Sequence, residues 1–86
     1  MEIEFTDEAL KELKYWQKTS RRTLERIKLL LADCAEHPEK GIGKPERLRY
    51  ELSGLWSRRI DNANRLVYRF DETVLTVISL RYHYKK

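Results

Sequence analysis

The sequence has few residues of the kinds that build covalent cross-links or metal sites. It contains one cysteine, Cys34, and two histidines, His37 and His83. A single thiol cannot form an internal disulfide, which fits a reducing compartment, so we expect a cytoplasmic protein. No group of His, Cys, Asp and Glu has the spacing of metal ligands. The sequence therefore predicts neither a metal nor another cofactor.

Long apolar runs are also absent. No stretch approaches the length that spans a bilayer, and the N-terminus lacks the basic region and apolar core of a secretory signal. Repeats, low-complexity segments and linkers are missing too. The chain has 86 residues, of which 37% are charged and 41% hydrophobic. We therefore expect residues 1–86 to form a single soluble domain with a small core and no contact with membranes.

Recognisable nucleotide-binding and hydrolase motifs are missing as well. The stretch GIG at 41–43 does not match a phosphate-binding glycine loop, and we interpret it as part of a turn. No seryl or cysteinyl hydrolase signature is present. Cys34 lies among Leu30, Leu31 and Ala35, and free cysteines are among the most buried residues. A core position is therefore favoured for Cys34 over a reactive nucleophile.

Positive charge is unevenly distributed along the chain. Residues 1–38 carry seven Lys or Arg and eight Asp or Glu, whereas residues 39–86 carry eleven and six. The net charge of +4 therefore comes from the second half. Such an excess indicates a polyanionic or acidic partner, although a basic face with no partner explains it equally well.

The apolar pattern predicts two helices in the first half of the chain. Alternation over residues 2–5 indicates a short strand, after which Thr6 offers an N-cap. Ser20 offers a second cap, and the second helix should end before Pro38 because the residue before proline resists the helical conformation. Apolar residues recur at helical spacing in both segments: Leu10, Leu13 and Trp16 in the first, and Leu24, Ile27, Leu31 and Cys34 in the second.

After a loop at 39–46 the period changes to two, which predicts strands. We expect them over about 47–52, 55–60, 65–70 and 73–82, with turns at Ser53-Gly54, 61–64 and 71–72. The predicted order is β-α-α-β-β-β. This is an α+β fold in which the two N-terminal helices pack on one face of a mostly antiparallel sheet.

The alternation also predicts which side chains share a sheet face. Trp56, Arg58 and Ile60 should face the helices, with Ser57 and Arg59 on the other side. Unless a bulge intervenes, the side away from the helices then displays Arg59, Arg65, Arg81 and His83 to water. Such a face suits RNA phosphates, although a solvated face without a ligand is a common alternative. Trp16 and Trp56 are interpreted as core residues, because both occupy apolar-periodic positions.

The same face carries groups that could cleave RNA without a metal. That reaction needs a base for the 2′-hydroxyl, a cation for the phosphorane and an acid for the departing 5′-oxygen. His83 could supply the acid, because imidazole titrates near neutrality. Glu46 could be the base, and Arg65 or Arg59 could stabilise the charge.

Four blocks of the sequence, in order, resemble the YoeB/Txe group of RelE-type bacterial toxins. The blocks are GIGKPERLR (41–49), LSGLWSRRID (52–61), NRLVYRF (64–70) and RYHY (81–84), and YW at 15–16 agrees with them. The resemblance implies the microbial-RNase-like RelE fold. It further implies a toxin of a type II toxin–antitoxin system that cuts mRNA in the ribosomal A site. The products would be a 2′,3′-cyclic phosphate or 3′-phosphate and a 5′-hydroxyl, with no metal required.

The resemblance also assigns roles to individual residues and to partners. It places the general base on Glu46, the transition-state arginine on Arg65, the general acid on His83 and a supporting aromatic on Tyr84. Contacts to mRNA or rRNA would fall on Lys44, Arg49, Arg59 and Arg81. A YefM/Axe-like antitoxin would neutralise the toxin, and homodimers are expected in this group.

The sequence departs from this group at two places, and two other functions stay open. Asn64 stands where relatives often have His, and Lys85 and Lys86 extend past the aromatic at which relatives often end. A non-catalytic ParE-like toxin of the same fold, which binds a protein, is the first alternative. It is disfavoured because such toxins lack the set of Glu46, Arg65 and His83. The second is a basic RNA-binding module without toxicity.

Overall fold

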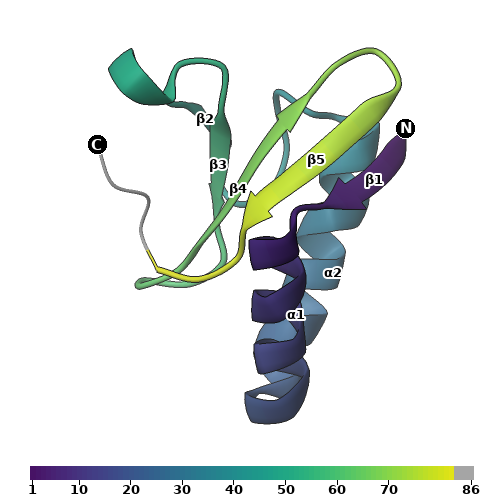
Figure 1. Cartoon of the computed structure of the whole chain (residues 1–86), viewed down its shortest axis with the longest axis vertical. Coiled ribbons are helices and arrows are strands. Elements are labelled where there is room, and N and C mark those ends of the chain that lie inside the picture. Colours follow the sequence, from purple (N-terminus) through teal and green to yellow (C-terminus); the bar gives the residue numbers. More distant parts are fainter. Residues whose placement is uncertain (83–86) are drawn as a thin grey trace.

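Two helices pack on a five-stranded mixed sheet in the computed structural model, which describes residues 1–82 (Figure 1). The strands lie in the order β1-β5-β4-β3-β2; β1 pairs with β5 in parallel, and the other neighbours are antiparallel. The predicted α+β fold, with two N-terminal helices on a mostly antiparallel sheet, is confirmed; four strands follow the helices, where the predicted order β-α-α-β-β-β has three. In chain order the elements are β1 (Glu2–Phe5), α1 (Asp7–Thr19), α2 (Arg21–Glu36), β2 (Glu46–Arg47), the 3-10 helix η1 (Tyr50–Leu52), β3 (Trp56–Arg59), β4 (Arg65–Phe70) and β5 (Val74–Ser79).

Both helices begin at the residues that the sequence marks as caps. The Thr6 hydroxyl accepts a hydrogen bond from the Ala9 N–H at 3.1 Å, and the Ser20 hydroxyl accepts one from the Thr23 N–H at 3.1 Å. These bonds satisfy N–H groups that lack partners inside the helix. The second helix ends at Glu36, before the His37-Pro38 pair, as predicted. None of the helices within residues 1–82 is long and apolar enough to cross a membrane.

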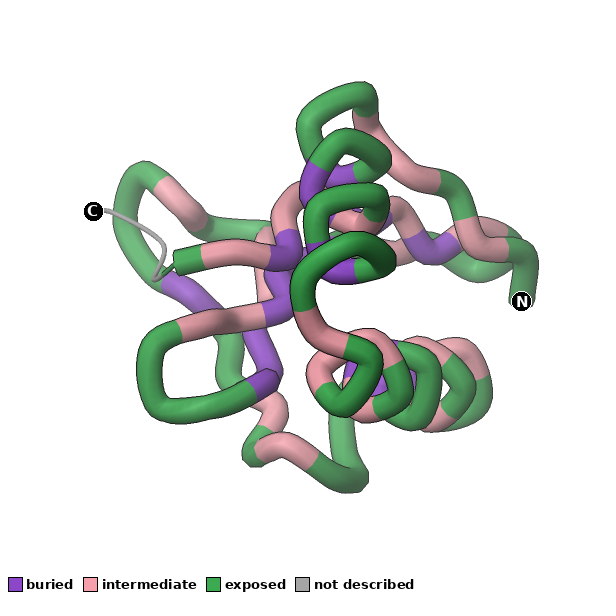
Figure 2. Tube along the Cα trace, turned by 90° about the horizontal axis from the view of Figure 1, so that it is seen from below, coloured by how far each residue is buried: buried purple, intermediate pink, exposed green. Residues whose placement is uncertain are grey.

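The hydrophobic core forms where the helices meet the sheet. Buried positions lie toward the middle of the molecule and exposed ones along its outside (Figure 2). Cys34 is fully buried, as predicted, and burial raises the pKa of its thiol to about 11, so it stays protonated at neutral pH. Trp16 belongs to the core, and Trp56 is half-buried against it.

The buried side of α1 differs from the predicted stripe. Ala9, Glu12 and Trp16 are buried, whereas Leu10 is 42% exposed. Glu12 occupies a core-facing position because its carboxylate accepts a hydrogen bond from the Leu80 N–H at 2.6 Å. Hydropathy alone places a charged residue at the surface, so the apolar pattern could not predict that Glu12 is buried and Leu10 exposed.

The strand predicted over 47–52 is wrong beyond its first residue. β2 covers only Glu46 and Arg47, and residues 50–52 form η1. Tyr50 has a φ of 59°, in the left-handed region, which interrupts the extended backbone that the alternation suggested. The turn is closed by hydrogen bonds from the Leu52 N–H to the Arg49 carbonyl and from the Ser53 N–H to the Tyr50 carbonyl.

A register shift corrects the predicted faces of β4 and β5. Val67 pairs with Ser79 and Tyr68 with Val77, so the pairing passes over Ile78. Ile78 is only half-buried, whereas Val67, which lies between Arg65 and Arg69 at every second position of β4, is 3% exposed. The strand also ends at Ser79 instead of 82. The face that carries Arg65 and Arg69 is therefore buried at Val67.

Candidate functional site

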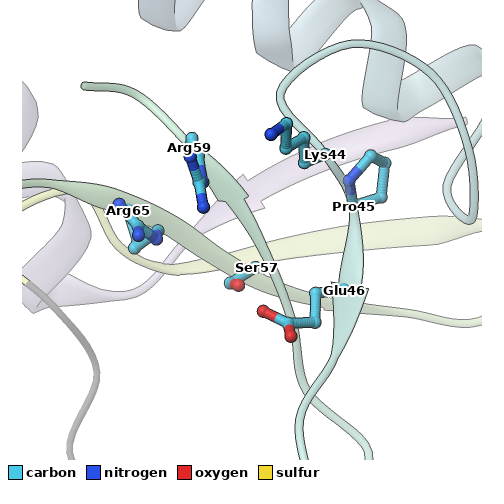
Figure 3. Close-up of a pocket in the computed structure, with 6 residues that line it drawn as sticks. All are labelled: Lys44, Pro45, Glu46, Ser57, Arg59 and Arg65. Carbon is cyan, nitrogen blue, oxygen red and sulfur yellow. The ribbon is translucent and has the colours of Figure 1, made fainter. Parts of the chain in front are cut away.

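A pocket of about 260 Å³ lies where β2, β3 and β4 run side by side. Its lining residues point toward a common space (Figure 3). They are Lys44, Pro45, Glu46, Ser57, Arg59 and Arg65. Four of the eight residues that the sequence analysis singled out therefore meet in one place, although they come from separate segments of the chain.

Strand pairing places the carboxylate of Glu46 opposite the two arginines. Glu46 pairs with Ser57 across β2 and β3, and Arg59 pairs with Arg65 across β3 and β4. Ser57 and Arg59 are two residues apart on one strand, so their side chains lie on the same face. The pairing thus brings one acidic and two basic side chains to the same side of the sheet.

The Arg65 side chain is held by the turn that precedes it. Its Nη1 donates hydrogen bonds to the carbonyl oxygens of Asp61 at 3.1 Å and Asn64 at 3.3 Å. One end of the guanidinium is thereby fixed against the backbone. Arg65 is half-buried and Arg59 is exposed, so the pocket is accessible to a ligand.

The charges that line the pocket are not paired with one another. Among residues 1–82 the ion pairs are Lys28–Glu25 and Arg58–Asp33, neither of which lies in the pocket. Three cations therefore face a single carboxylate. This set can bind a phosphodiester through the guanidinium groups while the carboxylate accepts a proton from a neighbouring hydroxyl.

A buried arginine beneath the pocket holds the loop that leads into β2. Arg58 is fully buried, and its guanidinium makes five hydrogen bonds, one for each N–H. The acceptors are Tyr68 Oη at 3.2 Å, Asp33 Oδ2 at 2.5 Å, and the carbonyl oxygens of Ile42 at 3.1 Å, His37 at 2.5 Å and Lys40 at 2.9 Å. Arg58 therefore ties the whole 37–42 loop to the sheet, directly before Lys44 and Glu46.

Arg49 and Arg81, which were also predicted to bind RNA, do not line this pocket. Arg49 is exposed between β2 and η1, outside the lining. The Arg81 guanidinium lies 3.6 Å from the centre of the Tyr15 ring on α1, because the chain leaves the sheet after Ser79. His83 and Tyr84 lie outside the described residues; the residue before them, Tyr82, accepts a hydrogen bond from the Arg65 N–H at 3.1 Å.

Sequence reasoning missed two residues that shape the site. Ser57 forms part of the lining although it is only 2% exposed. Arg58 was placed on the helix-facing side with Trp56 and Ile60, which is correct, but its role as an anchor was not foreseen. The available signal was an arginine at an apolar-periodic position, which requires buried partners.

Within residues 1–82, no cluster of three or more His, Cys, Asp and Glu side chains could hold a metal ion.

Comparison with known proteins assigns the chain to a family. Residues 5–84 match the YoeB-like toxin of bacterial type II toxin–antitoxin systems. Toxin YoeB of Streptomyces coelicolor is 45% identical over 84 residues, which cover 98% of this chain and 100% of that protein.

Solved structures agree with this assignment. The YoeB/ParE toxin from Agrobacterium tumefaciens has a TM-score of 0.94 at 37% identity, covering 98% of this chain and 100% of that one. YoeB from Staphylococcus aureus, solved as a dimer and in a heterotetrameric complex with YefM, is 36% identical, with TM-scores of 0.91 and 0.89 and coverage of 98% of each chain. The chain therefore belongs to the YoeB-like toxins of bacterial type II toxin–antitoxin systems.

Proposed function

We propose that this toxin is an endoribonuclease that cuts mRNA displayed in the ribosomal A site. The observation that carries the proposal is the meeting of Glu46, Arg59 and Arg65 in one net-positive pocket, where these side chains form no ion pair with one another. A non-catalytic toxin that only binds a protein has no need of a carboxylate set against two arginines. The sequence similarity to a toxin named YoeB over nearly the whole chain also supports an activity as a toxin of this family.

The groups of the pocket suit an in-line attack within the RNA strand. Glu46 removes the proton of the 2′-hydroxyl, and the 2′-oxygen attacks the adjacent phosphorus. Arg65 and Arg59 stabilise the negative charge that develops on the phosphorane oxygens. The bond from phosphorus to the 5′-oxygen breaks while His83 donates a proton to that oxygen, and Tyr84 supports the acid. The products are a 2′,3′-cyclic phosphate and a 5′-hydroxyl.

Partners follow from the family and from the charge. The S. aureus relative forms a complex with YefM and a dimer. By analogy this toxin binds a YefM-like antitoxin and forms a homodimer. Lys44, Arg49, Arg59 and Arg81 contribute to binding mRNA or rRNA, since phosphate contacts dominate affinity for nucleic acids.

Mapping of mRNA 5′ ends in a purified translation reaction tests the activity. With the toxin present we expect new 5′ ends inside the codon at the A site, each carrying a 5′-hydroxyl. Replacement of the proton donor, His83→Gln, should lower the cleavage rate by about 10²–10⁴. The Glu46→Ala variant should lose cleavage as well.

The ParE-like alternative gives a different result in the same reaction. Intact mRNA at toxin concentrations equal to those of the ribosomes would contradict the nuclease. Full cleavage by both the His83→Gln and Glu46→Ala variants would contradict the assigned roles. Circular dichroism of each variant checks that the fold is retained.

A further inference from the structure

The three residues after β5 are outside the sheet but fixed on both sides. Residues 80–82 follow the last strand residue, Ser79, and lead to His83. Helix α1 binds the backbone of Leu80, and the turn between β3 and β4 binds the backbone of Tyr82. Within the described part of the chain, the pocket takes part in these contacts through the Arg65 N–H, which donates to the Tyr82 carbonyl. The attachment therefore needs its own explanation.

Asn64 makes the contact on the turn side. Its Oδ1 accepts a hydrogen bond from the Tyr82 N–H at 2.6 Å. Its Nδ2 donates to both carboxylate oxygens of Asp61, at 3.1 and 3.2 Å. The Asp61 carboxylate can only accept hydrogen bonds, so the Asn64 amide must turn its NH₂ group toward Asp61 and its oxygen toward Tyr82. The next residue, Arg65, donates its N–H to the Tyr82 carbonyl at 3.1 Å.

Tyr82 adopts a conformation that needs such support. Its φ is 61°, in the left-handed region that residues with a Cβ rarely occupy. Tyr82 is 61% exposed, and its ring contacts the neighbouring Arg81, whose guanidinium carbon lies 4.6 Å from the ring centre and whose Nη2 donates to Tyr82 Oη at 2.7 Å. Two hydrogen bonds hold its backbone at this point: the Tyr82 N–H donates to Asn64 Oδ1, and the Tyr82 carbonyl accepts from the Arg65 N–H.

Glu12 and Trp16 make the contact on the helix side. Leu80 is fully buried; its N–H donates to Glu12 Oε1 at 2.6 Å, and its carbonyl accepts from Trp16 Nε1 at 2.9 Å. Glu12 is only 9% exposed, and burial of a carboxylate costs free energy that an apolar side chain would avoid. Its retention beside Leu80 is explained if the position of this backbone matters.

We propose that Asn64 and Glu12 are positioning residues for the proton donor of the proposed reaction. They fix the backbone one and three residues before His83, beside the backbone of Arg65. One peptide bond joins Tyr82 to His83, so a shift of Tyr82 passes directly to the acid. The inference rests on the proposed function, and a displacement of about 1 Å can lower a rate by about 10²-fold.

A substrate that needs no proton donor separates this role from a general loss of structure. Replacing the 5′-oxygen at the cleaved bond by sulfur gives a thiolate leaving group, which departs without protonation because thiols ionise far more readily than alcohols. On a ribosome-bound mRNA with the normal oxygen, Asn64→Leu should cleave about 10- to 100-fold more slowly than wild type. With the sulfur substrate the two rates should agree within about threefold, as they should for His83→Gln. The Glu46→Gln variant, which lacks the base, should be slow on both.

Conservative and remote variants complete the design. Glu12→Gln keeps an oxygen that accepts the Leu80 N–H and should cleave at about the wild-type rate, whereas Glu12→Met should behave like Asn64→Leu. Asp71→Leu removes a carboxylate that caps the β4–β5 turn, accepting from the N–H groups of Thr73 and Val74 at 2.8 Å. That turn lies at the other end of the hairpin, so the variant controls for lost turn stability. Its cleavage rate should match wild type.

Each outcome decides between the proposals. The positioning role would be overturned if Asn64→Leu slowed cleavage of both substrates equally, or if it cleaved the normal substrate at the wild-type rate. The positioning role would also be overturned if Asn64→Leu changed only the ribosome concentration that gives half the maximal rate and left the maximal rate unchanged. If Asn64→Leu does not fold, the Glu12→Gln and Glu12→Met pair decides by the same criteria. Absence of cleavage by the wild type, or full activity of His83→Gln, would instead refute the proposed function itself.

Discussion

The pair of Arg58 and Asp33 shows how one buried residue can organise a site that it does not enter. The Arg58 side chain is fully buried, and that of its ion-pair partner Asp33 is 24% exposed. Breaking such a pair leaves a buried charge without compensation, which is strongly destabilising. The guanidinium also satisfies three loop carbonyl oxygens. The loop before Glu46 therefore depends on a residue that only the three-dimensional structure reveals as an anchor.

The Arg58–Asp33 pair makes the stability of the toxin depend on pH. The hydrogen bond from Arg58, followed by that from the Ile42 N–H, lowers the pKa of Asp33 in the folded state. A carboxyl with a lowered folded pKa stabilises the fold fully above its unfolded pKa of about 3.9. This contribution is lost as the pH falls through the lower, folded value. Asp33→Asn should therefore be less stable than wild type at pH 7, with a difference that shrinks below pH 4.

Urea unfolding of both proteins from pH 7 downward measures this difference. Asp71, whose pKa is lowered by the N–H groups of Thr73 and Val74, is present in both proteins, so its contribution cancels. A difference in the free energy of unfolding that stays constant down to the lowest pH at which both proteins fold would show that the charge of Asp33 is not what stabilises the loop.

At the scale of elements, the sequence predicted what depends on local rules. The caps at Thr6 and Ser20, the end of α2 before Pro38, and the turn at Gly54, whose φ is 95°, follow from the preferences of single residues. The faces on which the side chains of β4 and β5 lie could not be predicted in this way, because the register shift at Val67 arises from pairing between strands. The left-handed Tyr50 was likewise unpredictable, since nothing in its residue type favours that conformation.

The candidate site was predictable in part for the same reason. Glu46, Arg59 and Arg65 were found because their residue types and the resemblance both marked them, and the strands then brought them together. Ser57 and Arg58 were not found, because their contacts join elements that are distant in sequence. Arg81 was expected to face away from the helices, but it stacks on Tyr15 because β5 ends two residues earlier.

The loop before β2 needs glycine at position 41. Its φ is 121°, and a Cβ there would lie 2.9 Å from Asp33 Cγ, closer still to Oδ2, and 3.2 Å from Arg58 Nη1. Gly41→Ala should therefore lower the free energy of unfolding by about 2–4 kcal/mol, the sum of backbone strain and overpacking. Gly54→Ala is the matched control: its φ is also positive, but nothing lies within 4 Å of the added Cβ.

A double-mutant cycle with Asp33→Ala identifies the cause of the Gly41 effect. Removing the Asp33 carboxylate removes the clash, so Gly41→Ala should cost less in that background, by about 1 kcal/mol or more. The free energies come from urea unfolding at pH 7. An equal cost in both backgrounds, or equal costs for Gly41→Ala and Gly54→Ala, would mean that backbone conformation alone requires the glycine.

At the scale of the whole molecule, the charge distribution agrees with the position of the pocket. The positive excess lies in residues 39–86, and this half of the chain supplies all six lining residues. Residues 1–38 supply both helices, which cover the sheet and carry a near balance of charge. The nearly neutral first half of the chain thus forms the helices that cover the core, and the positively charged second half forms the pocket.

This division predicts how salt affects binding to RNA. Each phosphate contact releases counterions, so for single strands the slope of log K against log salt falls by about 0.7 per contact. Lys44→Gln and Arg59→Gln should each reduce the slope by about that amount, because both residues line the pocket. Arg69→Gln removes an equal charge from an exposed position on β4 outside the lining and should leave the slope nearly unchanged. Fluorescence anisotropy with an RNA carrying a 2′-deoxy nucleotide at the cleavage position measures binding without cleavage. Equal slopes for Arg59→Gln and Arg69→Gln would show that RNA responds to the net charge of the molecule and does not occupy this pocket.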